Sequence, residues 1–536
     1  MPVIGLYLFH ALYYGAWIND DAGISFTYAR NLSNGYGLVL NPGDERVEGY
    51  SNPLWVFILS LFSLSGLLDP VVTPKALSIL STFASFYLLY RISQHIFGSE
   101  KSLFHLLPPL LLSTNVSFVV WSISGLENGI YVLLILLAAY LYLKESDDPA
   151  RRPFSGIFFF MAAIARPEGI LYFAAAFFHK LLTTVLKKQA AVRDLFWAGL
   201  FVIPLLIYHV WHFWYFASFF PNTYYAKMPV GNHLSKIWDT VLNFDSPGWI
   251  YVKTAFRDYN LRILLFSALF IVILYFRRSF QSIALILLFL GVTLFYPIYV
   301  GGDWMMHYRF LSPFFPLAYL FMGGALLGLW QLFTSQMAHR TIKNNLFRIP
   351  LYAISSFVVL FMITLLIYPN ILYAKRVKAD PTVPFSFIAK YGEKFNALAE
   401  KAFIQDASLL HPDLGGTSWV SRIRMLDLAG LADVHIARYH WYPKYFREYI
   451  FKEQKPTFIH THCYWSAITR VNKYPELRRD YVPLWENECR VPGYRGVIDG
   501  EYVRKDVFVL SNPALNDNEA VAGFNDVIEL SKEESM

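Results

Sequence analysis

Residues 282–300 read SIALILLFLGVTLFYPIYV, a run of 19 residues without a charged side chain. A helix of roughly 20 apolar residues spans a bilayer, and a chain exposed to lipid has few other options. Similar runs recur from the N-terminus to about Tyr373. Of the 536 residues, 55% are hydrophobic and 16% are charged, against roughly 25% charged in soluble domains. The sequence therefore predicts a polytopic α-helical membrane protein.

The length rule predicts about eleven transmembrane helices. They are Pro2–Ile18, Val71–Ser93, Leu103–Val120, Ile130–Leu143, Phe154–Ala165, Ile170–Leu182, Leu195–Phe216, Leu261–Phe276, Ser282–Val300, Phe310–Phe333 and Pro350–Leu372. Basic pairs such as Arg151-Arg152 and Arg277-Arg278 gather in every second connection, and positive residues favour the cytoplasmic side. The first loop (residues 19–52) and everything after the last span are then expected outside. The segment Pro53–Leu67 is apolar but short, and a full span there would invert this pattern, so we expect a juxtamembrane, half-inserted helix.

The composition changes after residue 375, where charged residues become dense and apolar runs shorten. We expect a membrane domain over residues 1–375 and an outer, soluble α+β domain over residues 376–536. This domain holds both cysteines, Cys463 and Cys489, and an oxidising compartment favours a disulfide between them. The string HTHC at His460–Cys463 suggests zinc, but a structural role is favoured because a fourth ligand is not evident. The pI near 9.0 follows from the inner basic connections, so we expect no nucleic-acid partner.

The first loop is the place where we expect chemistry. Residues 18–55 read INDDAGISFTYARNLSNGYGLVLNPGDERVEGYSNPLW. Adjacent carboxylates such as Asp20 and Asp21 are costly near hydrocarbon and usually mark a site. They could act as a general base or help to hold a divalent cation, Mg²⁺ or Mn²⁺. Capping of the helix that follows explains them equally well.

Other polar residues are expected at the outer ends of spans or in outer loops: Glu48, Glu127, Arg166, Glu168, Asn222, Lys227, Asp303 and Arg309. Interfacial charges are common, but so many on one face predict a polar cavity that opens outward. Such a cavity suits a reaction between a lipid-linked donor and an outer acceptor. Arg166, Lys227 and Arg309 could then bind the phosphate of the donor. The string GGDWMMHYRFLSP (residues 301–313) predicts a tight turn at its two glycines. The alternative to a functional role is a turn in the belt of aromatic residues at the membrane interface. His209 and His212 have no acidic neighbour in sequence, so packing is favoured over metal binding.

These strings closely resemble a bacterial family of GT-C-type glycosyltransferases. That family includes the mycobacterial terminal arabinofuranosyltransferases and related flagellar motor control proteins. The resemblance starts with the first loop and continues in order through WSISGLEN, ARPEG, FFPNTYYAK, VGGDWMMHYRFLSP and DLAGLAD. It covers most of the chain and thins over residues 234–260 and after about Ala437.

The resemblance implies a GT-C fold, a polyprenyl-phosphate-linked sugar donor, and an inverting transfer with a catalytic Asp in the first loop. Either Asp20 or Asp21 would take that role, and we favour Asp20, which lies nearest the membrane. The residues predicted to bind donor or acceptor are Arg46, Glu48, Tyr50, Asn52, Glu127, Arg166, Glu168, Asn222, Tyr224, Lys227, Asp303, His307 and Arg309. Gly23 stands where many relatives carry an aromatic residue, so the donor sugar, a hexose or a pentose, stays open.

The expected partners are the lipid-linked sugar, membrane lipid, and an envelope glycan or lipid as acceptor. The expected location is the bacterial inner (cytoplasmic) membrane, with the active site and the C-terminal domain extracytoplasmic. Two other functions are weighed against transfer. A transporter or flippase tends to show paired halves with broken helices, a pattern that the sequence does not display. A non-catalytic envelope or flagellar assembly factor would not need the acidic pair.

Overall fold

A computed structural model describes residues 2–98, 102–187, 192–227, 240–339, 345–439 and 442–507. The chain separates into two compact units. The membrane unit comprises residues 1–17, 71–208 and 232–382, and the sheet unit comprises residues 18–70, 209–231 and 383–536. The expected boundary at 375/376 falls inside a helix, α16 (Asn345–Ala379). The first loop and residues 209–231 group with the C-terminal domain, which the sequence did not predict.

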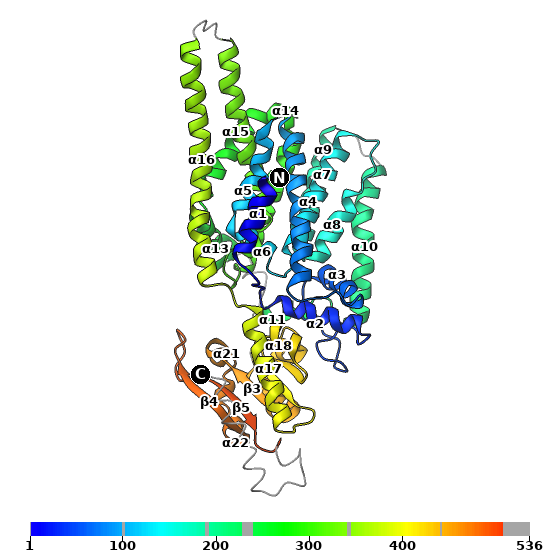
Figure 1. Cartoon of the computed structure of the whole chain (residues 1–536). Helices are drawn as coiled ribbons and strands as arrows, with labels where there is room; N and C mark the ends of the chain where they lie inside the picture. The colour runs from blue at the N-terminus through cyan, green and yellow to red at the C-terminus, as the bar shows by residue number, and fades with distance from the viewer. Residues whose placement is uncertain are drawn as a thin grey trace. The chain divides into compact units, whose positions relative to one another are not determined.

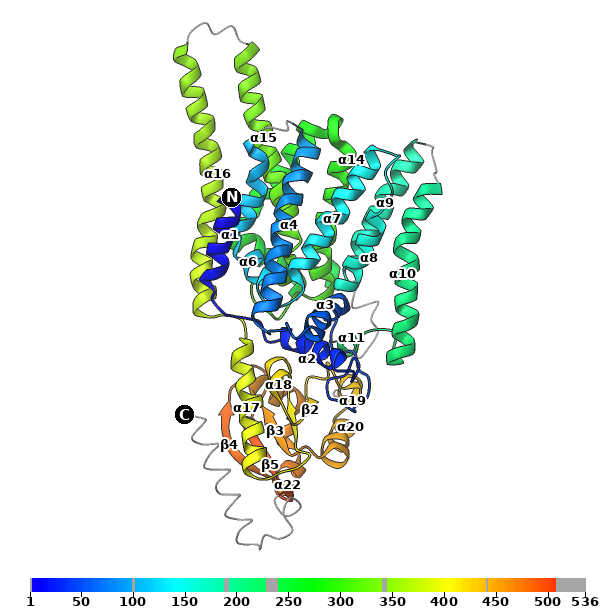
Figure 2. The same cartoon turned by 45° about the vertical axis from the view of Figure 1, so that its right-hand side comes forward.

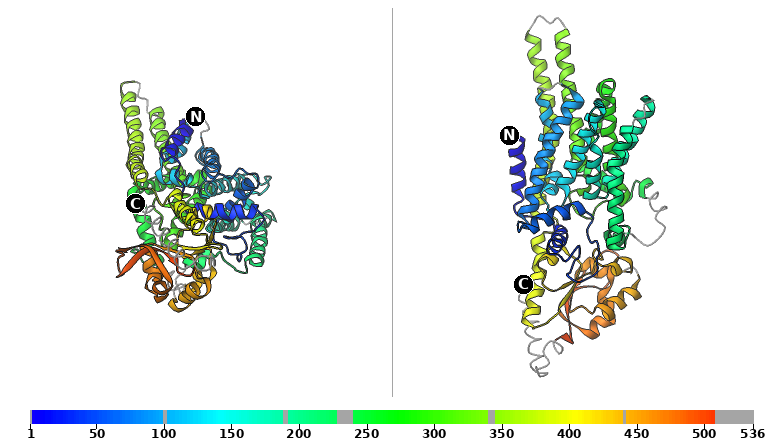
Figure 3. Two further views of the ribbon diagram at one scale, coloured as in Figure 1. Left: turned by 60° about the horizontal axis from the view of Figure 1, so that its bottom comes forward. Right: turned by 90° about the vertical axis from the view of Figure 1, so that its right-hand side faces the viewer.

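The membrane unit is a bundle of helices (Figures 1 and 2). In chain order they are α1 (Pro2–Tyr13), α4 (Val72–Phe97), η1 (Leu103–Leu106), α5 (Leu107–Thr114), α6 (Val116–Ser122), α7 (Asn128–Asp147), α8 (Ser155–Ala165), α9 (Gly169–Lys187), α10 (Val192–Phe216), α13 (Pro247–Asp258), α14 (Arg262–Val300), η2 (Arg309–Leu311), α15 (Phe314–His339) and α16. Helix α10 continues into the sheet unit after residue 208. The helices α15 and α16 run side by side and extend past the rest of the bundle (Figure 3, right).

Each of the eleven expected spans overlaps one or more of these helices, but Leu103–Val120 is divided among η1, α5 and α6, and Pro2–Ile18 continues past the end of α1. Within the described residues, six helices are long and apolar enough to cross a membrane, or seven if the pair Leu103–Thr114 and Val116–Ser122, bent by 69°, is one span. Three further expected spans form shorter apolar helices, α1, α8 and α9. The spans expected at Leu261–Phe276 and Ser282–Val300 lie on either side of a kink at Ser279 (φ −135°, ψ 27°) in α14. The chain is therefore a multi-pass helical membrane protein, as predicted.

Small residues allow the bundle helices to pack closely. A Cβ added to Gly324 of α15 would overlap the ring of Phe97 at the end of α4, and one on Gly323 would lie 2.7 Å from Pro108 Cγ in α5. Packing between membrane helices depends on such close approach, because burial from lipid contributes no hydrophobic driving force. The glycines of α15 thus position α4 and α5 at the centre of the bundle.

The sheet unit is α+β, as expected from the composition of its C-terminal part. Its helices are α2 (Ala22–Ser33), α3 (Pro53–Leu64), α11 (Asn222–Lys227), α17 (Phe385–Lys401), α18 (Gly415–Val420), α19 (Val434–Tyr439), α20 (Pro443–Glu448), the π-helix η3 (Tyr449–Gln454), α21 (Cys463–Thr469), η4 (Val471–Lys473) and α22 (Pro475–Asp480). Helix α3 has 12 residues, or roughly 18 Å at 1.5 Å per residue. It is therefore too short to span a bilayer, as its sequence predicts.

Five strands form one mixed sheet: β1 (Ser408–His411), β2 (Arg424–Asp427), β3 (Phe458–Thr461), β4 (Tyr481–Cys489) and β5 (Val497–Arg504). The strand order is β2-β1-β3-β5-β4. Strand β1 is parallel to β2 and β3, whereas β5 is antiparallel to β3 and β4. Figure 3 shows the long β4–β5 hairpin. A core of buried side chains such as Leu410, Ile459 and Tyr502 packs the sheet against the π-helix and its neighbours.

Candidate functional site

The backbone on either side of Asp20 pairs with the segment that leads into α17. Asn19 forms an antiparallel bridge with Pro384. The Asp20 amide donates to the Val383 carbonyl at 3.0 Å, and the Phe385 amide donates to the Ile18 carbonyl at 2.9 Å. These contacts fix the start of the first loop against the start of the C-terminal domain.

The Asp20 carboxylate is held by the first two residues of α18, the short helix that follows β1. It accepts the Gly416 amide at 2.6 Å and the Gly415 amide at 3.3 Å, and the residue is only 5% exposed. Burial raises the pKa of Asp20 well above its usual range, and the charges of Asp21 and Asp413 act in the same direction. The two amides oppose this shift, because hydrogen bonds to a carboxylate favour its charged form. The start of α18 therefore orients a buried carboxyl group whose proton affinity is increased.

Asp21 occupies the N-cap position of α2, but within the described chain its side chain makes no capping hydrogen bond to that helix. Its side chain is partly exposed, in contrast to Asp20. Asp21 therefore occupies the expected cap position without the expected side-chain hydrogen bond.

Gly23 lies where α2 touches the start of α18. A Cβ at Gly23 would overlap the Gly415 backbone and lie 2.8 Å from the ring of Phe385. A side chain larger than glycine would separate α2 from the residues of α18 that hold Asp20. Close packing thus requires glycine at position 23.

A second buried pair joins the first loop to α10. Glu48 Oε2 lies 2.6 Å from His212 Nε2, and both side chains are 2% exposed. His212 has no acidic neighbour in sequence, and the fold brings it an acidic partner from 164 residues away. Asn222 donates its amide to the Glu48 carbonyl and its side chain to the carbonyls of Gly430, Leu431 and Asp433. Glu48 and Asn222 therefore brace the loop against the sheet domain.

The remaining predicted residues of the sheet unit divide into buried and exposed ones. Tyr50 is 4% exposed and packs edge-on against Tyr28, and the buried Asn52 accepts the Ser25 hydroxyl at 3.1 Å. Arg46 is exposed, with its guanidinium 4.5 Å from the centre of the Tyr215 ring. Tyr224 and Lys227 are exposed on α11. Of these residues, Arg46, Tyr224 and Lys227 are therefore the ones with exposed side chains.

In the membrane unit, Arg166 lies between two carboxylates. Its guanidinium donates to Glu127 at 2.6 Å and forms a second, very short contact with Glu168. All three residues are at most 7% exposed, and the Tyr131 and Phe310 rings lie 5.7 and 5.5 Å from the guanidinium carbon. The structure thus gathers three predicted residues from two turns into one buried cluster with an excess of negative charge.

The turn after α14 contains a second ion pair. Arg309 donates to both oxygens of Asp303, at 2.9 and 3.3 Å. Gly301 and Gly302 adopt φ of +85° and +86°, as the tight turn predicted from the sequence requires.

The same turn has two features that the sequence did not indicate. His307 and Tyr308 also have positive φ, +69° and +57°, which is costly for residues with a Cβ. The His307 carbonyl accepts the Trp121 indole at 2.9 Å and the Ser117 hydroxyl at 2.6 Å. Residues from α6 therefore hold a strained turn in place.

Cys463 and Cys489 form a disulfide, with their Cα atoms 5.6 Å apart. The nearby histidines pair with acids: His460 with Glu501 at 3.2 Å and His462 with Asp413 at 3.0 Å. Over the described ranges, no group of three or more His, Cys, Asp and Glu side chains could hold a metal ion. This applies to the HTHC string and to the acidic pair alike, and the need for a divalent cation stays a prediction.

Comparisons with known proteins agree with this architecture. A family model described as a domain of unknown function (DUF8728) matches residues 388–505. A terminal β-(1→2)-arabinofuranosyltransferase of Corynebacterium glutamicum is 27% identical over 362 residues, which are 58% of this chain and 48% of that protein. The chain thus spans about half the length of this curated relative.

Two solved structures are similar over almost the whole chain. The oligosaccharyltransferase AglB from Archaeoglobus fulgidus, in complex with an inhibitory peptide and a dolichol-phosphate, matches with a TM-score of 0.54 at 10% identity. The match covers 93% of this chain and 74% of that one. ArnT from Cupriavidus metallidurans, bound to undecaprenyl phosphate, matches with a TM-score of 0.51 at 11% identity, covering 93% and 97%. The chain therefore has the fold of the GT-C membrane glycosyltransferases.

Proposed function

We propose that this protein is a glycosyltransferase that moves a sugar from a polyprenyl-phosphate donor to an extracytoplasmic acceptor, an envelope glycan or a lipid. The observation that carries this proposal is the Asp20 carboxylate, buried at the start of the first loop and oriented by two backbone amides. The resemblance of the first loop to a transferase family, and the lipid phosphates bound by the two similar structures, support it.

Asp20 suits the role of general base. Its pKa is raised by burial, which brings its proton affinity closer to that needed near neutral pH. A carboxylate offers about four lone-pair positions, and the two amides of α18 use two of them. The others can accept the proton of an acceptor hydroxyl. The amides fix the direction in which those lone pairs point.

The proposed reaction is a single displacement with inversion. The acceptor oxygen attacks the anomeric carbon as its proton passes to Asp20. The bond from that carbon to the phosphate oxygen breaks on the opposite face, and the lipid phosphate leaves with the electron pair. Charge therefore grows on the leaving phosphate, and a nearby cation stabilises the transition state more than the ground state.

We assign the phosphate contact in the sheet unit to Lys227. Its ammonium group lies at the exposed C-terminal end of α11. Arg166 and Arg309 are also predicted phosphate ligands, but both are buried and already paired with carboxylates. A phosphate could reach either arginine only by entering a buried site, whereas the Lys227 side chain is exposed.

The test compares Asp20→Asn with Asp21→Asn in a strain that lacks the gene, with envelope glycans analysed by mass spectrometry. Transfer is also measured with purified protein in nanodiscs and polyprenyl-phosphate sugars. Loss of a general base typically costs about 10²–10⁴-fold in rate, and we expect this loss for Asp20→Asn while the protein stays folded. If only Asp21→Asn loses transfer, Asp21 is the base. Wild-type rates in both variants would refute the mechanism, and donor movement across the bilayer without transfer would indicate a flippase.

A further inference from the structure

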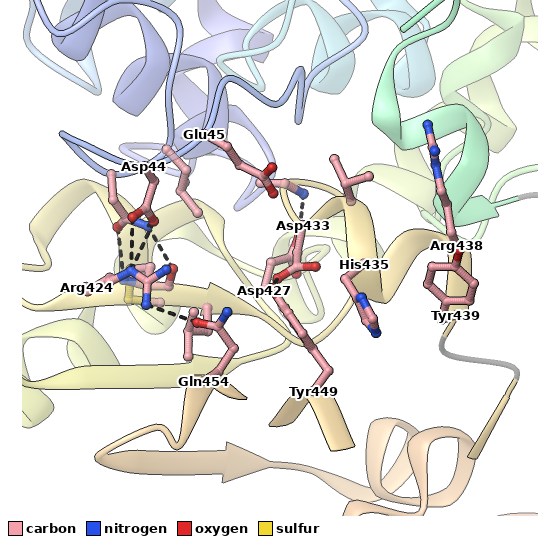
Figure 4. Close-up of a pocket in the computed structure, with 16 residues that line it drawn as sticks. Asp44, Glu45, Arg424, Asp427, Asp433, His435, Arg438, Tyr439, Tyr449 and Gln454 are labelled. Carbon is pink, nitrogen blue, oxygen red and sulfur yellow. Dashed lines mark hydrogen bonds and ion pairs between the residues drawn. The ribbon is translucent and has the colours of Figure 1, made fainter. Parts of the chain in front are cut away.

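The sheet unit contains a cavity that the catalytic proposal does not use. Its volume is about 450 Å³, within the range of roughly 300–1,000 Å³ typical of small-molecule sites. Three segments line it: residues 40–45 of the first loop, residues 424–439 from β2 through α19, and the π-helix η3. Figure 4 shows the side chains that converge on it.

One wall of the cavity is acidic and rigid. Asp427 is 1% exposed and accepts the Ala429 and Ala432 amides at 2.8 and 2.7 Å. Asp433 is 7% exposed and accepts the Ile436 amide at 2.8 Å and the Tyr449 hydroxyl at 2.7 Å. Glu45 faces them from the first loop (Figure 4). Burial raises the pKa of all three carboxyl groups, that of Asp427 to about 7.

The two arginines around the cavity do not neutralise this wall. Arg424 is bound to Asp44 at 3.1 Å and to Gln454 at 3.0 Å. Arg438 also lines the cavity, and its guanidinium lies 5.1 Å from the centre of the Tyr225 ring. The lining therefore offers hydrogen-bond acceptors and repels anions. A ligand with many hydroxyl or amine donors suits it, and a phosphate does not.

The other wall is aromatic and continues onto the surface. The His435 and Tyr449 rings are stacked, with centroids 4.1 Å apart and planes at 12°. Tyr439 lines the cavity and lies 5.6 Å from Tyr445 and 6.5 Å from Tyr442. These three tyrosines are 41%, 52% and 44% exposed, in that order. Exposed aromatic clusters of this kind mark binding surfaces.

We propose that the cavity together with Tyr439, Tyr442 and Tyr445 is a saccharide-binding site. One sugar ring lies in the cavity against the His435–Tyr449 stack, with its hydroxyls donating to Asp433 and Glu45. Further sugars of the same chain lie with their C–H faces on the three tyrosines. The acidic wall selects a neutral or amine-bearing glycan over the anionic donor lipid, so the site holds the acceptor. This assignment rests on the proposed transferase function and names the acceptor as an oligosaccharide.

The experiment uses the full-length protein in nanodiscs and an array of neutral oligosaccharides, including arabinan, mannan and galactan fragments. Binding to any hit is then measured by titration. Tyr445→Ala removes part of the exposed aromatic surface, and Glu45→Gln removes a charge from the cavity. Tyr464→Ala is the matched control, because Tyr464 is 58% exposed in the same unit but does not line the cavity.

We expect the wild-type protein and Tyr464→Ala to bind at least one oligosaccharide equally, and Tyr445→Ala and Glu45→Gln to bind it at least tenfold more weakly. Undecaprenyl phosphate binding should be unchanged in both weakened variants. The absence of any bound oligosaccharide, equal losses in Tyr445→Ala and Tyr464→Ala, or competition by inorganic phosphate would overturn the site. Binding is read without turnover, so sugar transfer by a protein that fails this test would leave the transferase proposal intact.

Discussion

Gly415 offers a direct test of how Asp20 is positioned. A Cβ at Gly415 would overlap the Asp20 carbonyl oxygen and lie 2.6 Å from Asp20 Oδ1. Gly415→Ala must therefore move either the start of the first loop or the start of α18. Both amide hydrogen bonds to the carboxylate depend on the present spacing. The substitution should separate Asp20 from the start of α18 without altering either carboxylate of the acidic pair.

The magnitude follows from these contacts. A hydrogen bond to a charged group contributes about 1.5–3 kcal/mol, so loss of both bonds would cost at most about 3–6 kcal/mol. A loss of about 3 kcal/mol lowers Tm by roughly 6–12 °C for a unit of this size. A shift of about 1 Å in the position of the base costs about 10²-fold in turnover. Gly415→Ala should therefore lose both stability and activity.

The assay measures transfer by folded protein well below its Tm, next to thermal unfolding of the same sample. Gly392→Ala is the matched control, because a Cβ there would lie 2.6 Å from Val420 Cγ2 and 2.7 Å from the Thr417 carbonyl oxygen. It pushes on Thr417 and Val420 of α18 and not on Gly415 or Gly416, which hold Asp20, so it should lose stability and keep most of the turnover. Gly291→Ala has nothing within 4 Å and should lose neither. Wild-type turnover in Gly415→Ala, or an equal loss of turnover in Gly291→Ala, would refute the positioning of Asp20 by the start of α18.

Three further predictions concern stability and the donor. Replacing Cys463 and Cys489 by Ser opens a loop of 26 residues, so the free energy of unfolding of the sheet unit should fall by about 3–4 kcal/mol. An unchanged denaturant midpoint would contradict this. Arg309→Lys cannot keep both contacts to Asp303, so its Tm should fall, and Asp303→Asn should lose stability in the same way. If Arg309 also contacts the donor phosphate, the folded Arg309→Lys variant should lose turnover as well, and folded Asp303→Asn should not. Burial raises the pKa of Asp427 from 3.8 to about 7, so as the pH rises the folded state keeps this proton longer than the unfolded chain. The free energy of unfolding should therefore decline by up to about 4 kcal/mol between pH 4 and 7. Asp427→Asn should flatten this decline when unfolding is measured at several pH values.

Local composition was enough to predict the class of protein and the helices. The apolar runs specify membrane helices because a backbone in lipid must satisfy its own hydrogen bonds, and each expected span overlaps helical structure. The glycine pair 301–302 predicts its left-handed turn for an equally local reason. Even so, two expected spans differ from the structure: Leu103–Val120 is bent by 69° between Leu103–Thr114 and Val116–Ser122, and Pro2–Ile18 is helical only to Tyr13. Hydropathy alone does not indicate at which residue a helix ends or where a span bends.

The partners of the predicted site residues were decided only by the tertiary structure. The amides that hold Asp20 lie 395 and 396 residues away in sequence, and the partner of Glu48 lies 164 residues away. Backbone amides leave no pattern in a sequence, since every residue except proline carries one. The sequence could therefore identify Asp20 as costly to bury, but not the group that meets it. A buried carboxylate needs compensating donors, and the folding of the whole chain determines which donors come within reach.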